Sequence, residues 1–322
     1  MTEAPPGVPL VIGIDVGGTK VLAVETDAGG GVVRTARRET PGRLVEPRLV
    51  EDALTAALLD VAEGRDVAAV GLAAAGFVDR AGERVRFAPH LPWRDDPVRD
   101  RLAARWGAPV ALDNDANCVA RAESTYGAAR GYDSALVITL GTGIGGAVLL
   151  DGTVVRGRNG MAGEFGHMQV VPDGQPCECG RRGCWEQYSS GNALVRLARD
   201  QIGRMPTLLD ELCGGDPGRL TGLMVSRAAE EGDLLARQAF ASVGDWLGVG
   251  VANLVAALDP EVVVIGGGVS AAGDRLLEPA RAAMSRVLVG SGHRDVPDLV
   301  RAHLGPAAGA IGAVDLARSF LT

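Results

Sequence analysis

The chain has 322 residues, with 47% hydrophobic and 22% charged side chains, a composition typical of folded globular proteins and not of disordered ones. Its 46 glycines follow no three-residue repeat, which excludes collagen. The formal net charge is −8 and no basic run exceeds two arginines, so we expect no nucleic-acid partner. We find no signal peptide, and the longest uncharged stretch, residues 134–150, is shorter than the ~20 residues of a membrane helix. We therefore expect a cytoplasmic protein of about two domains that binds no membrane.

Apolar runs separated by glycine turns and helical repeats predict an α/β protein. We expect strands at residues 10–15, 21–26, 67–72, 110–112, 136–140, 147–150 and 261–265. We expect helices at residues 48–63, 98–106, 116–127, 234–258, 275–288 and 307–321. Residues 1–9 are expected to form a mobile leader, and residues 156–190 a long irregular stretch rich in glycine and cysteine.

One segment of the chain resembles a segment later in the sequence, which indicates an internal repeat. Shifted by 126 residues, segment 12–24 lies over segment 138–150, and Gly17 falls on Gly143. Both segments have the pattern strand, glycine turn, strand. The repeat predicts two similar α/β domains facing each other across a cleft. The alternative is a chance similarity of apolar and glycine residues.

Three glycine-rich turns follow predicted strands. In the first two, the absent side chains allow backbone N–H groups to approach phosphate oxygens, and the third suits close approach of a nucleotide base or ribose. The candidate residues are Asp15, Gly17, Gly18, Thr19 and Lys20 in the first turn, Gly141, Thr142, Gly143, Gly145 and Gly146 in the second, and Gly266, Gly267 and Gly268 in the third. Asp15 is also suited to hold Mg²⁺. The second turn matches G-x-G-x-x-G, but a strand rather than a helix follows it, which argues against a Rossmann fold. Ordinary turns are the alternative reading.

A histidine and three cysteines lie within 18 residues: His167, Cys177, Cys179 and Cys184. One imidazole and three thiolates suit a tetrahedral zinc ion, and four protein ligands make such an ion structural rather than catalytic. The alternative is unpaired thiols in a loop. Glu164 and Glu186 flank this group, and paired carboxylates suit a polyhydroxyl ligand, unless they are solvated surface charges.

The sequence Asp113-Asn114-Asp115 stands where a predicted strand passes into a helix. Asp115 is a candidate general base that accepts a hydroxyl proton while the oxygen attacks a phosphoryl group. The alternative is helix capping, in which aspartate and asparagine are preferred residues.

These segments together resemble the ROK family of bacterial sugar kinases, and within it the glucokinases. The resemblance is carried by IDVGGTK (14–20), AAGFVD (74–79), DNDAN (113–117), LGTGIGG (140–146), GEFGHMQV (163–170), CECGRRGCWE (177–186) and VVIGGGVS (263–270). It spans residues 10 to 321, and the His-Cys pattern is its most specific part.

The resemblance implies a two-lobed actin/hexokinase-like (ribonuclease H-like) α/β fold with the active site in the interlobe cleft. The small lobe would comprise residues 1–115 and 305–322, and the large lobe residues 116–304 with a zinc-binding loop. The implied reaction is ATP-dependent phosphorylation of the 6-hydroxyl of glucose to glucose 6-phosphate in glycolysis. The implied cofactors are ATP, Mg²⁺ and structural Zn²⁺, and the implied assembly is a homo-oligomer, a dimer or tetramer.

The resemblance also assigns roles to single residues. Asp115 would be the catalytic base. The sugar would be bound by Gly76, Asn114, Asp115, Glu164, His167 and Glu186. His167 would bind zinc through one ring nitrogen and sugar through the other, and the three glycine turns would hold the nucleotide. The chain departs from the pattern at Ala75, where many relatives have proline, a change expected to loosen the sugar loop.

Four alternatives remain open. The acceptor is glucose, or else mannose, N-acetylmannosamine, N-acetylglucosamine or fructose. The donor is ATP or polyphosphate. A third alternative is a sugar-responsive transcriptional repressor of the same family. Repressors carry a DNA-binding segment before the first phosphate loop, whereas here ten residues precede Val11. A non-catalytic sugar sensor is the fourth, although the candidate base and both phosphate loops are present.

Overall fold

The computed structural model describes residues 9–321, so nearly all of the predicted leader lies outside the described residues. The chain forms two compact units. The first unit comprises Met1–Asp133, Ala147–Gly163 and His303–Thr322, and the second comprises Ser134–Gly146 and Glu164–Ala302. The lobe boundaries implied by the resemblance stay a prediction. The compact units differ from them by including residues 116–133, Ala147–Gly163 and residues 303–304 in the first unit.

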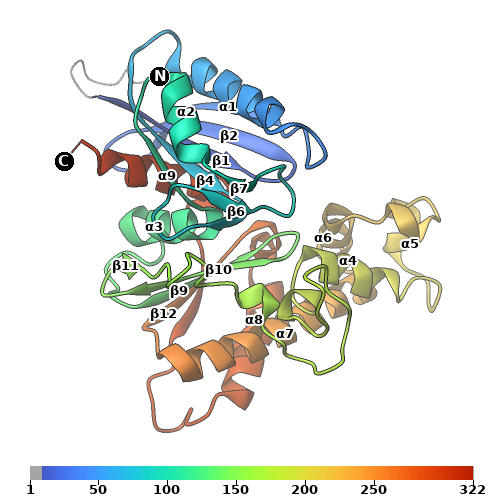
Figure 1. Ribbon diagram of the computed structural model, residues 1–322. Coiled ribbons are helices and arrows are strands. Elements are labelled where there is room, and N and C mark those ends of the chain that lie inside the picture. Colours follow the sequence, from blue (N-terminus) through green and yellow to red (C-terminus); the bar gives the residue numbers. More distant parts are fainter. Residues whose placement is uncertain (1–8, 322) are drawn as a thin grey trace. The chain divides into compact units, whose positions relative to one another are not determined.

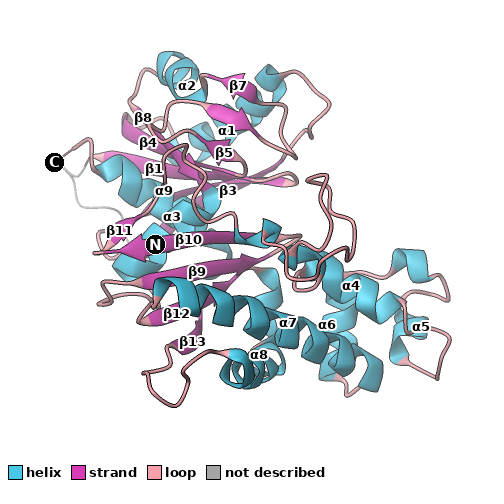
Figure 2. Cartoon of the chain, turned by 60° about the horizontal axis from the view of Figure 1, so that its bottom comes forward, coloured by secondary structure: helices cyan, strands magenta, loops and turns pink. Residues whose placement is uncertain are grey.

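The first unit is built on a five-stranded sheet. Its strands are β1 (Leu10–Val16), β2 (Lys20–Thr26), β3 (Val32–Glu39), β4 (Val67–Ala74) and β8 (Val110–Asn114), in the order β3-β2-β1-β4-β8 (Figure 2). β1 pairs antiparallel with β2 and parallel with β4, and β4 pairs parallel with β8. The carboxyl ends of β1, β4 and β8 therefore meet at one edge of the sheet, in a register that aligns Asp15 with Ala73 and Ala73 with Asp113.

Helices cover both faces of this sheet. They are α1 (Pro47–Ala62), α2 (Val98–Trp106), α3 (Asp115–Tyr126) and α9 (Ala308–Arg318) (Figure 1). Ile12 and Ile14 of β1 are buried in the core that contains α1, whereas Val11 is buried in the core that contains α9, as strand alternation requires. A Cβ atom on Gly13 would lie 2.0 Å from the carbonyl oxygen of Ala310, so glycine allows α9 to pack directly on the strand.

A small three-stranded sheet completes the first unit. Its strands are β5 (Phe77–Val78), β6 (Val85–Phe87) and β7 (Arg94–Asp96), in the order β5-β6-β7. This sheet was not predicted from the sequence, because strands of two or three residues carry too few residues for a periodic pattern.

The second five-stranded sheet repeats the order of the first. Its strands are β9 (Ala135–Leu140), β10 (Ile144–Leu150), β11 (Thr153–Val154), β12 (Val262–Gly266) and β13 (Asp298–Arg301), in the order β11-β10-β9-β12-β13. The hairpin β9–β10 takes the place of β1–β2, and parallel β12 and β13 take the places of β4 and β8. This shared order supports the duplication predicted from segments 12–24 and 138–150.

The helices of the second unit pack against one another through glycines. They are α4 (Gly191–Arg199), α5 (Leu208–Leu212), α6 (Gly222–Glu230), α7 (Leu234–Leu258) and α8 (Asp274–Val287). By length and composition α7 is apolar enough to cross a membrane, but half of its most apolar window is buried within the protein. A Cβ atom on Gly248 would lie 2.2 Å from the carbonyl oxygen of Ala280, so α7 and α8 are in close contact. We therefore interpret α7 as a core helix.

The strands and helices predicted from periodicity are present with shifts of a few residues at their ends, and α2 and α7 have the predicted bounds. The elements not predicted are β3, β5–β7, β11, β13 and α4–α6, together with five 3-10 turns. The 3-10 turns are Phe165–His167, Trp185–Gln187, Pro217–Arg219, Gly268–Ala272 and Gly305–Ala307.

Candidate active site and metal centre

The junction between β8 and α3 places the candidate base in the first unit. The helix is capped by Asn114, whose Oδ1 accepts hydrogen bonds from the backbone N–H groups of Ala116 (2.8 Å) and Asn117 (3.2 Å). Asp115 is thus the first helical residue rather than the cap, although its Oδ1 also accepts the N–H of Ala116 at 2.9 Å. Asn114 also donates through Nδ2 to the carbonyl oxygen of Gly76 at 3.0 Å, so two predicted sugar ligands contact each other.

Two carboxyl groups of the first unit have raised pKa values. Burial, together with the negative charge of Asp115, raises the pKa of Asp15 to about 7, and Lys20 partly opposes this effect. Burial also raises the pKa of Asp115, against hydrogen bonds from neighbouring backbone N–H groups and Asn114. Carboxylates with raised pKa values hold a proton more readily than ordinary ones, as a general base must during the reaction.

The first glycine turn is fixed by backbone hydrogen bonds within the first unit. The N–H of Gly17 donates to the carbonyl oxygen of Lys20 at 3.0 Å, closing the turn between β1 and β2. The hydroxyl of Thr40 donates to the carbonyl oxygen of Gly17 at 2.7 Å. The N–H of Ala75 donates to the carbonyl oxygen of Val16 at 3.0 Å, a bond that proline cannot make. Ala75 therefore ties the residue after β4 to the end of β1, and the expectation of a looser sugar loop stays a prediction.

The second and third glycine turns lie next to each other in the second unit. β10 begins at Ile144, inside the G-x-G-x-x-G segment, so this turn is the tip of a hairpin and not the start of a Rossmann helix, as predicted. Gly267, with φ of +81°, has no room for a side chain, because a Cβ atom would lie 2.4 Å from the carbonyl oxygen of Leu140. The N–H of Gly191, the first residue of α4, donates to the carbonyl oxygen of Gly141 at 2.8 Å and holds the second turn.

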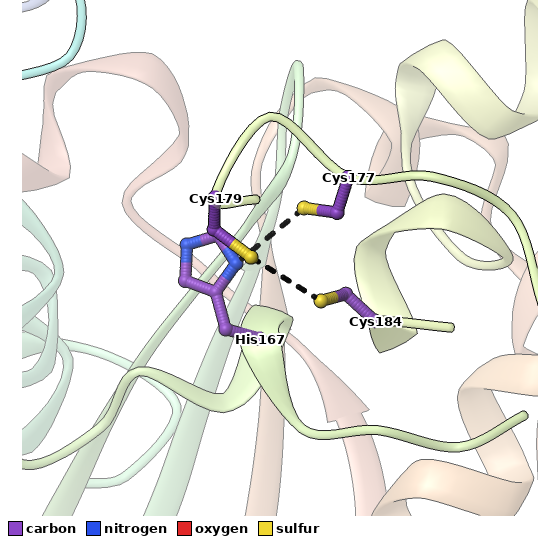
Figure 3. A group of neighbouring side chains, drawn as sticks. All are labelled: His167, Cys177, Cys179 and Cys184. Carbon is purple, nitrogen blue, oxygen red and sulfur yellow. Dashed lines mark hydrogen bonds between the residues drawn. The ribbon is translucent and has the colours of Figure 1, made fainter. Parts of the chain in front are cut away.

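The predicted metal ligands come together in the second unit (Figure 3). The ligand atoms of His167, Cys177, Cys179 and Cys184 all lie within 4.8 Å of one another. The sulfur atoms of Cys179 and Cys184 are 3.5 Å apart, and the sulfur of Cys177 is 3.8 Å from Nδ1 of His167. Sulfur atoms of a tetrahedral zinc site with Zn–S bonds near 2.3 Å are separated by about 3.8 Å. The cluster therefore has the spacing and the donor atoms to hold a zinc ion.

Glu186 joins this cluster to the second glycine turn. Its Oε1 accepts a hydrogen bond from the thiol of Cys177 at 3.1 Å and lies 3.6 Å from Nδ1 of His167. Its Oε2 occupies the space beside Gly143, where a Cβ atom would be only 2.3 Å away. Glu164 stands at the start of the 3-10 turn that carries His167, and its carbonyl oxygen accepts the His167 N–H at 3.2 Å. Glu186 is thus a constrained group and not a freely solvated surface charge.

The predicted site residues divide between the two units. Gly76, Asn114, Asp115 and the turn at residues 15–20 belong to the first unit. Glu164, His167, Glu186 and the turns at residues 141–146 and 266–268 belong to the second. One residue near the proposed base was not predicted from the sequence: Arg156, whose guanidinium binds the buried carboxylate of Asp113. An isolated arginine in an irregular segment gives no signal of its partner.

Comparison with known proteins gives consistent matches over nearly the whole chain. The model of the ROK family matches residues 11–319. The glucokinase of Streptomyces coelicolor is 41% identical over 96% of this chain and 98% of its own length, and that of Thermotoga maritima is 37% identical over 84% and 86%. The crystal structure of a ROK family glucokinase from Streptomyces griseus in complex with glucose and AMPPNP superposes with a TM-score of 0.89, at 42% identity, covering 96% of this chain and 99% of that one. The predicted fold class is thereby confirmed.

Proposed function

Since the chain belongs to the ROK family, we propose that it is an ATP-dependent glucokinase, which transfers the γ-phosphoryl group of ATP to the 6-hydroxyl of glucose. The observation that carries the proposal is the match to the Streptomyces griseus glucokinase bound to glucose and AMPPNP, with 42% identity over 96% of this chain. The geometry of Asp115 supports it, because a carboxyl group of raised pKa stands at the first residue of α3, next to the capping residue Asn114.

In the proposed reaction Asp115 accepts the proton of the sugar 6-hydroxyl. The hydroxyl oxygen attacks the γ-phosphorus of ATP, the bond to the β,γ-bridging oxygen breaks, and ADP leaves. The products are glucose 6-phosphate, ADP and a proton. Asn114, held by the carbonyl oxygen of Gly76 and by its own helix cap, is assigned to the sugar hydroxyls with Gly76, Glu164, His167 and Glu186.

The glycine turns are assigned to the nucleotide. Their backbone N–H groups are suited to phosphate oxygens, and Thr19 and Lys20 add a hydroxyl and an ammonium in the first turn. Asp15 fits a role in holding Mg²⁺, because it is a carboxylate at the end of β1 beside this turn. When bound, the ion supplies positive charge to the phosphates.

We assign a structural zinc ion to His167, Cys177, Cys179 and Cys184. The donor set fits zinc, and four protein ligands leave no open coordination position for chemistry. The ion would stiffen the segment that carries Glu164, His167 and Glu186. This order matters because bidentate and paired contacts to sugar hydroxyls need side chains held in one geometry.

A coupled assay of ADP release across a hexose panel tests the proposed function. The panel comprises glucose, mannose, N-acetylmannosamine, N-acetylglucosamine and fructose, and it is repeated with polyphosphate in place of ATP. We expect the highest kcat/KM with glucose and ATP. Comparable turnover of an acetamido sugar, or faster turnover with polyphosphate, would contradict the substrate assignment while leaving a ROK kinase.

We further infer a cytoplasmic homo-oligomer, a dimer or tetramer, without membrane or nucleic-acid partner. The net charge of −8 supports the last point, because nucleic-acid binders present a basic surface. Light scattering coupled to size exclusion measures the assembly directly, and a mass of about 33 kDa at micromolar concentration would contradict it.

A further inference from the structure

Asp113 is a buried carboxylate that directly precedes the proposed sugar ligand Asn114 and the proposed base Asp115. Its Oδ1 accepts hydrogen bonds from the backbone N–H of Asn114 at 2.8 Å and from Nδ2 of Asn117 at 2.9 Å. These bonds fix the last residue of β8 and the first turn of α3. The side chain of Asp113 therefore fixes the junction between β8 and α3, which carries the proposed base.

The other oxygen of Asp113 is held by Arg156. Nε and Nη2 of the guanidinium donate to Oδ2 at 3.0 and 2.5 Å. Within residues 9–321, Arg156 is the cation that forms an ion pair with Asp113. A lysine cannot reproduce such a two-pronged contact, because its ammonium is a single point of charge.

The backbone around Arg156 is anchored independently within the first unit. The carbonyl oxygen of Arg156 accepts the N–H of Ala162 at 3.1 Å, and the N–H of Val155 donates to Val148 at 2.9 Å. A Cβ atom on Gly160 would lie 2.0 Å from the carbonyl oxygen of Val78, so this loop packs tightly on its neighbour. The guanidinium therefore reaches Asp113 from a fixed support.

We propose that Arg156 is a positioning residue for phosphoryl transfer, acting through Asp113 to orient Asn114 and Asp115. The inference rests on the proposed function, because it assigns those two residues to sugar binding and proton acceptance. Without the guanidinium, the buried carboxylate of Asp113 would lose its cation in a region that already holds Asp15 and Asp115. The side chain of Asp113 would then rotate toward other hydrogen-bond donors. The junction would then lose its single orientation.

The test compares two arginine variants that break matched ion pairs of the first unit. Arg156→Met removes the cation of Asp113. Arg101→Met removes the cation of Glu51, another buried carboxylate, held through Nε at 2.7 Å, and also breaks the contact of Arg101 with Asp96 at 2.9 Å. The side-chain exposures are 28% and 5% for the first pair and 36% and 6% for the second. Both variants lose a buried pair, but only the first pair adjoins the proposed base.

We expect Arg156→Met to lower kcat/KM for the hexose by about 10- to 100-fold, as misplacement of a reacting group by about 1 Å does, while KM for ATP changes less than about twofold. Arg101→Met should keep kcat/KM within about twofold of wild type, although both variants unfold at lower denaturant concentration. Arg156→Lys should recover part of the loss in kcat/KM, because lysine restores the positive charge but not the two N–H donors of the guanidinium.

A double-mutant cycle separates action through Asp113 from any other role. If Arg156 acts through this carboxylate, Arg156→Met should change kcat/KM by less than about threefold when Asp113→Asn is already present. Equal losses in both backgrounds, or an Arg156→Met enzyme as active as Arg101→Met, would overturn the positioning role. Wild-type turnover across the hexose panel is measured first. A wild type inactive on every hexose defeats the proposed function, whereas an active wild type with an unaffected Arg156→Met variant defeats the positioning role alone.

Discussion

The two five-stranded sheets have the same strand order, yet they carry different chemistry. In the first, the hairpin β1–β2 encloses a turn with Asp15 and Lys20, and in the second, the hairpin β9–β10 has Gly141 and Gly146 at the corresponding positions. The junction after β8 carries Asn114 and Asp115. The segment that follows β13, residues 302–304, carries no carboxylate.

The shared part of the two sheets is a backbone feature. Each hairpin tip is rich in glycine, and a backbone without side chains of its own suits the approach of phosphate oxygens in both places. The differing part is charge. The first unit has two carboxyl groups with raised pKa values. In the second unit, the ionisable site residues gather around the histidine and the three cysteine thiols of the candidate metal centre. We therefore propose that the repeated turns bind phosphate and that side chains present in the first copy alone take part in proton transfer.

The largest effect should follow removal of the base from the first sheet. Asp115→Asn should lower kcat by about 10³-fold or more, because general base catalysis contributes up to ~10⁴-fold. Asn114 still caps α3, so the circular dichroism spectrum and the glucose affinity, measured by calorimetry, should change little. A variant that turns over at more than about one tenth of the wild-type rate would show that the proton goes elsewhere.

The next effect concerns Asp15, which has no counterpart in the second hairpin. A folded-state pKa of about 7 lies above the ordinary 3.8, so the folded protein binds this proton more tightly than the unfolded chain. The contribution to stability is complete below pH 4 and is lost as the pH rises through about 7. Asp15→Asn should therefore be more stable than wild type at pH 8, by at most ~4 kcal/mol, with the difference shrinking toward pH 4.

Urea unfolding at several pH values without added Mg²⁺ measures this difference. Asp298→Asn, at an exposed position of β13, is the control and should follow the wild type across the whole range. Because Asp115 contributes to the raised pKa, the gain from Asp15→Asn should be smaller in an Asp115→Asn background. A constant difference between pH 4 and pH 8 would refute the raised pKa.

A smaller effect should follow loss of the metal from the second unit. Cys179→Ala removes an exposed ligand and little packing, so it should abolish zinc binding and raise KM for glucose by about 10- to 100-fold. Cys213→Ala removes a buried cysteine of the same unit outside the cluster and should keep the zinc. Elemental analysis is expected to find about one zinc per wild-type chain. A wild-type enzyme that contains no zinc and is fully active would refute the proposed structural role of the ion.

The sequence predicted the parts of this arrangement that local patterns encode. The glycine turns, the helix that begins at Asp115 and the His-Cys cluster each depend on residues close together in the chain. The pairing of Arg156 with Asp113 joins positions 43 residues apart, and the contact of Glu186 with Gly143 joins distant loops. Such contacts depend on how strands and turns pack, which no periodicity records. Short strands such as β11 and β13 were not predicted for a related reason: pairing with neighbouring strands, rather than their own residues, defines them.

The contact between Glu186 and Gly143 gives the finest test of the comparison, because Gly17 is the corresponding glycine of the first hairpin. A Cβ atom on Gly143 would lie 2.3 Å from Oε2 of Glu186, whereas one on Gly17 would meet nothing closer than 4.0 Å. Gly143→Ala should displace the carboxylate and raise KM for glucose by about tenfold, roughly the loss of one hydrogen bond to a charged group. Gly17→Ala should leave KM for glucose within about twofold. Steady-state kinetics at saturating ATP measure both, and equal effects of the two substitutions would mean that the turns differ in sequence but not in their connection to the sugar site.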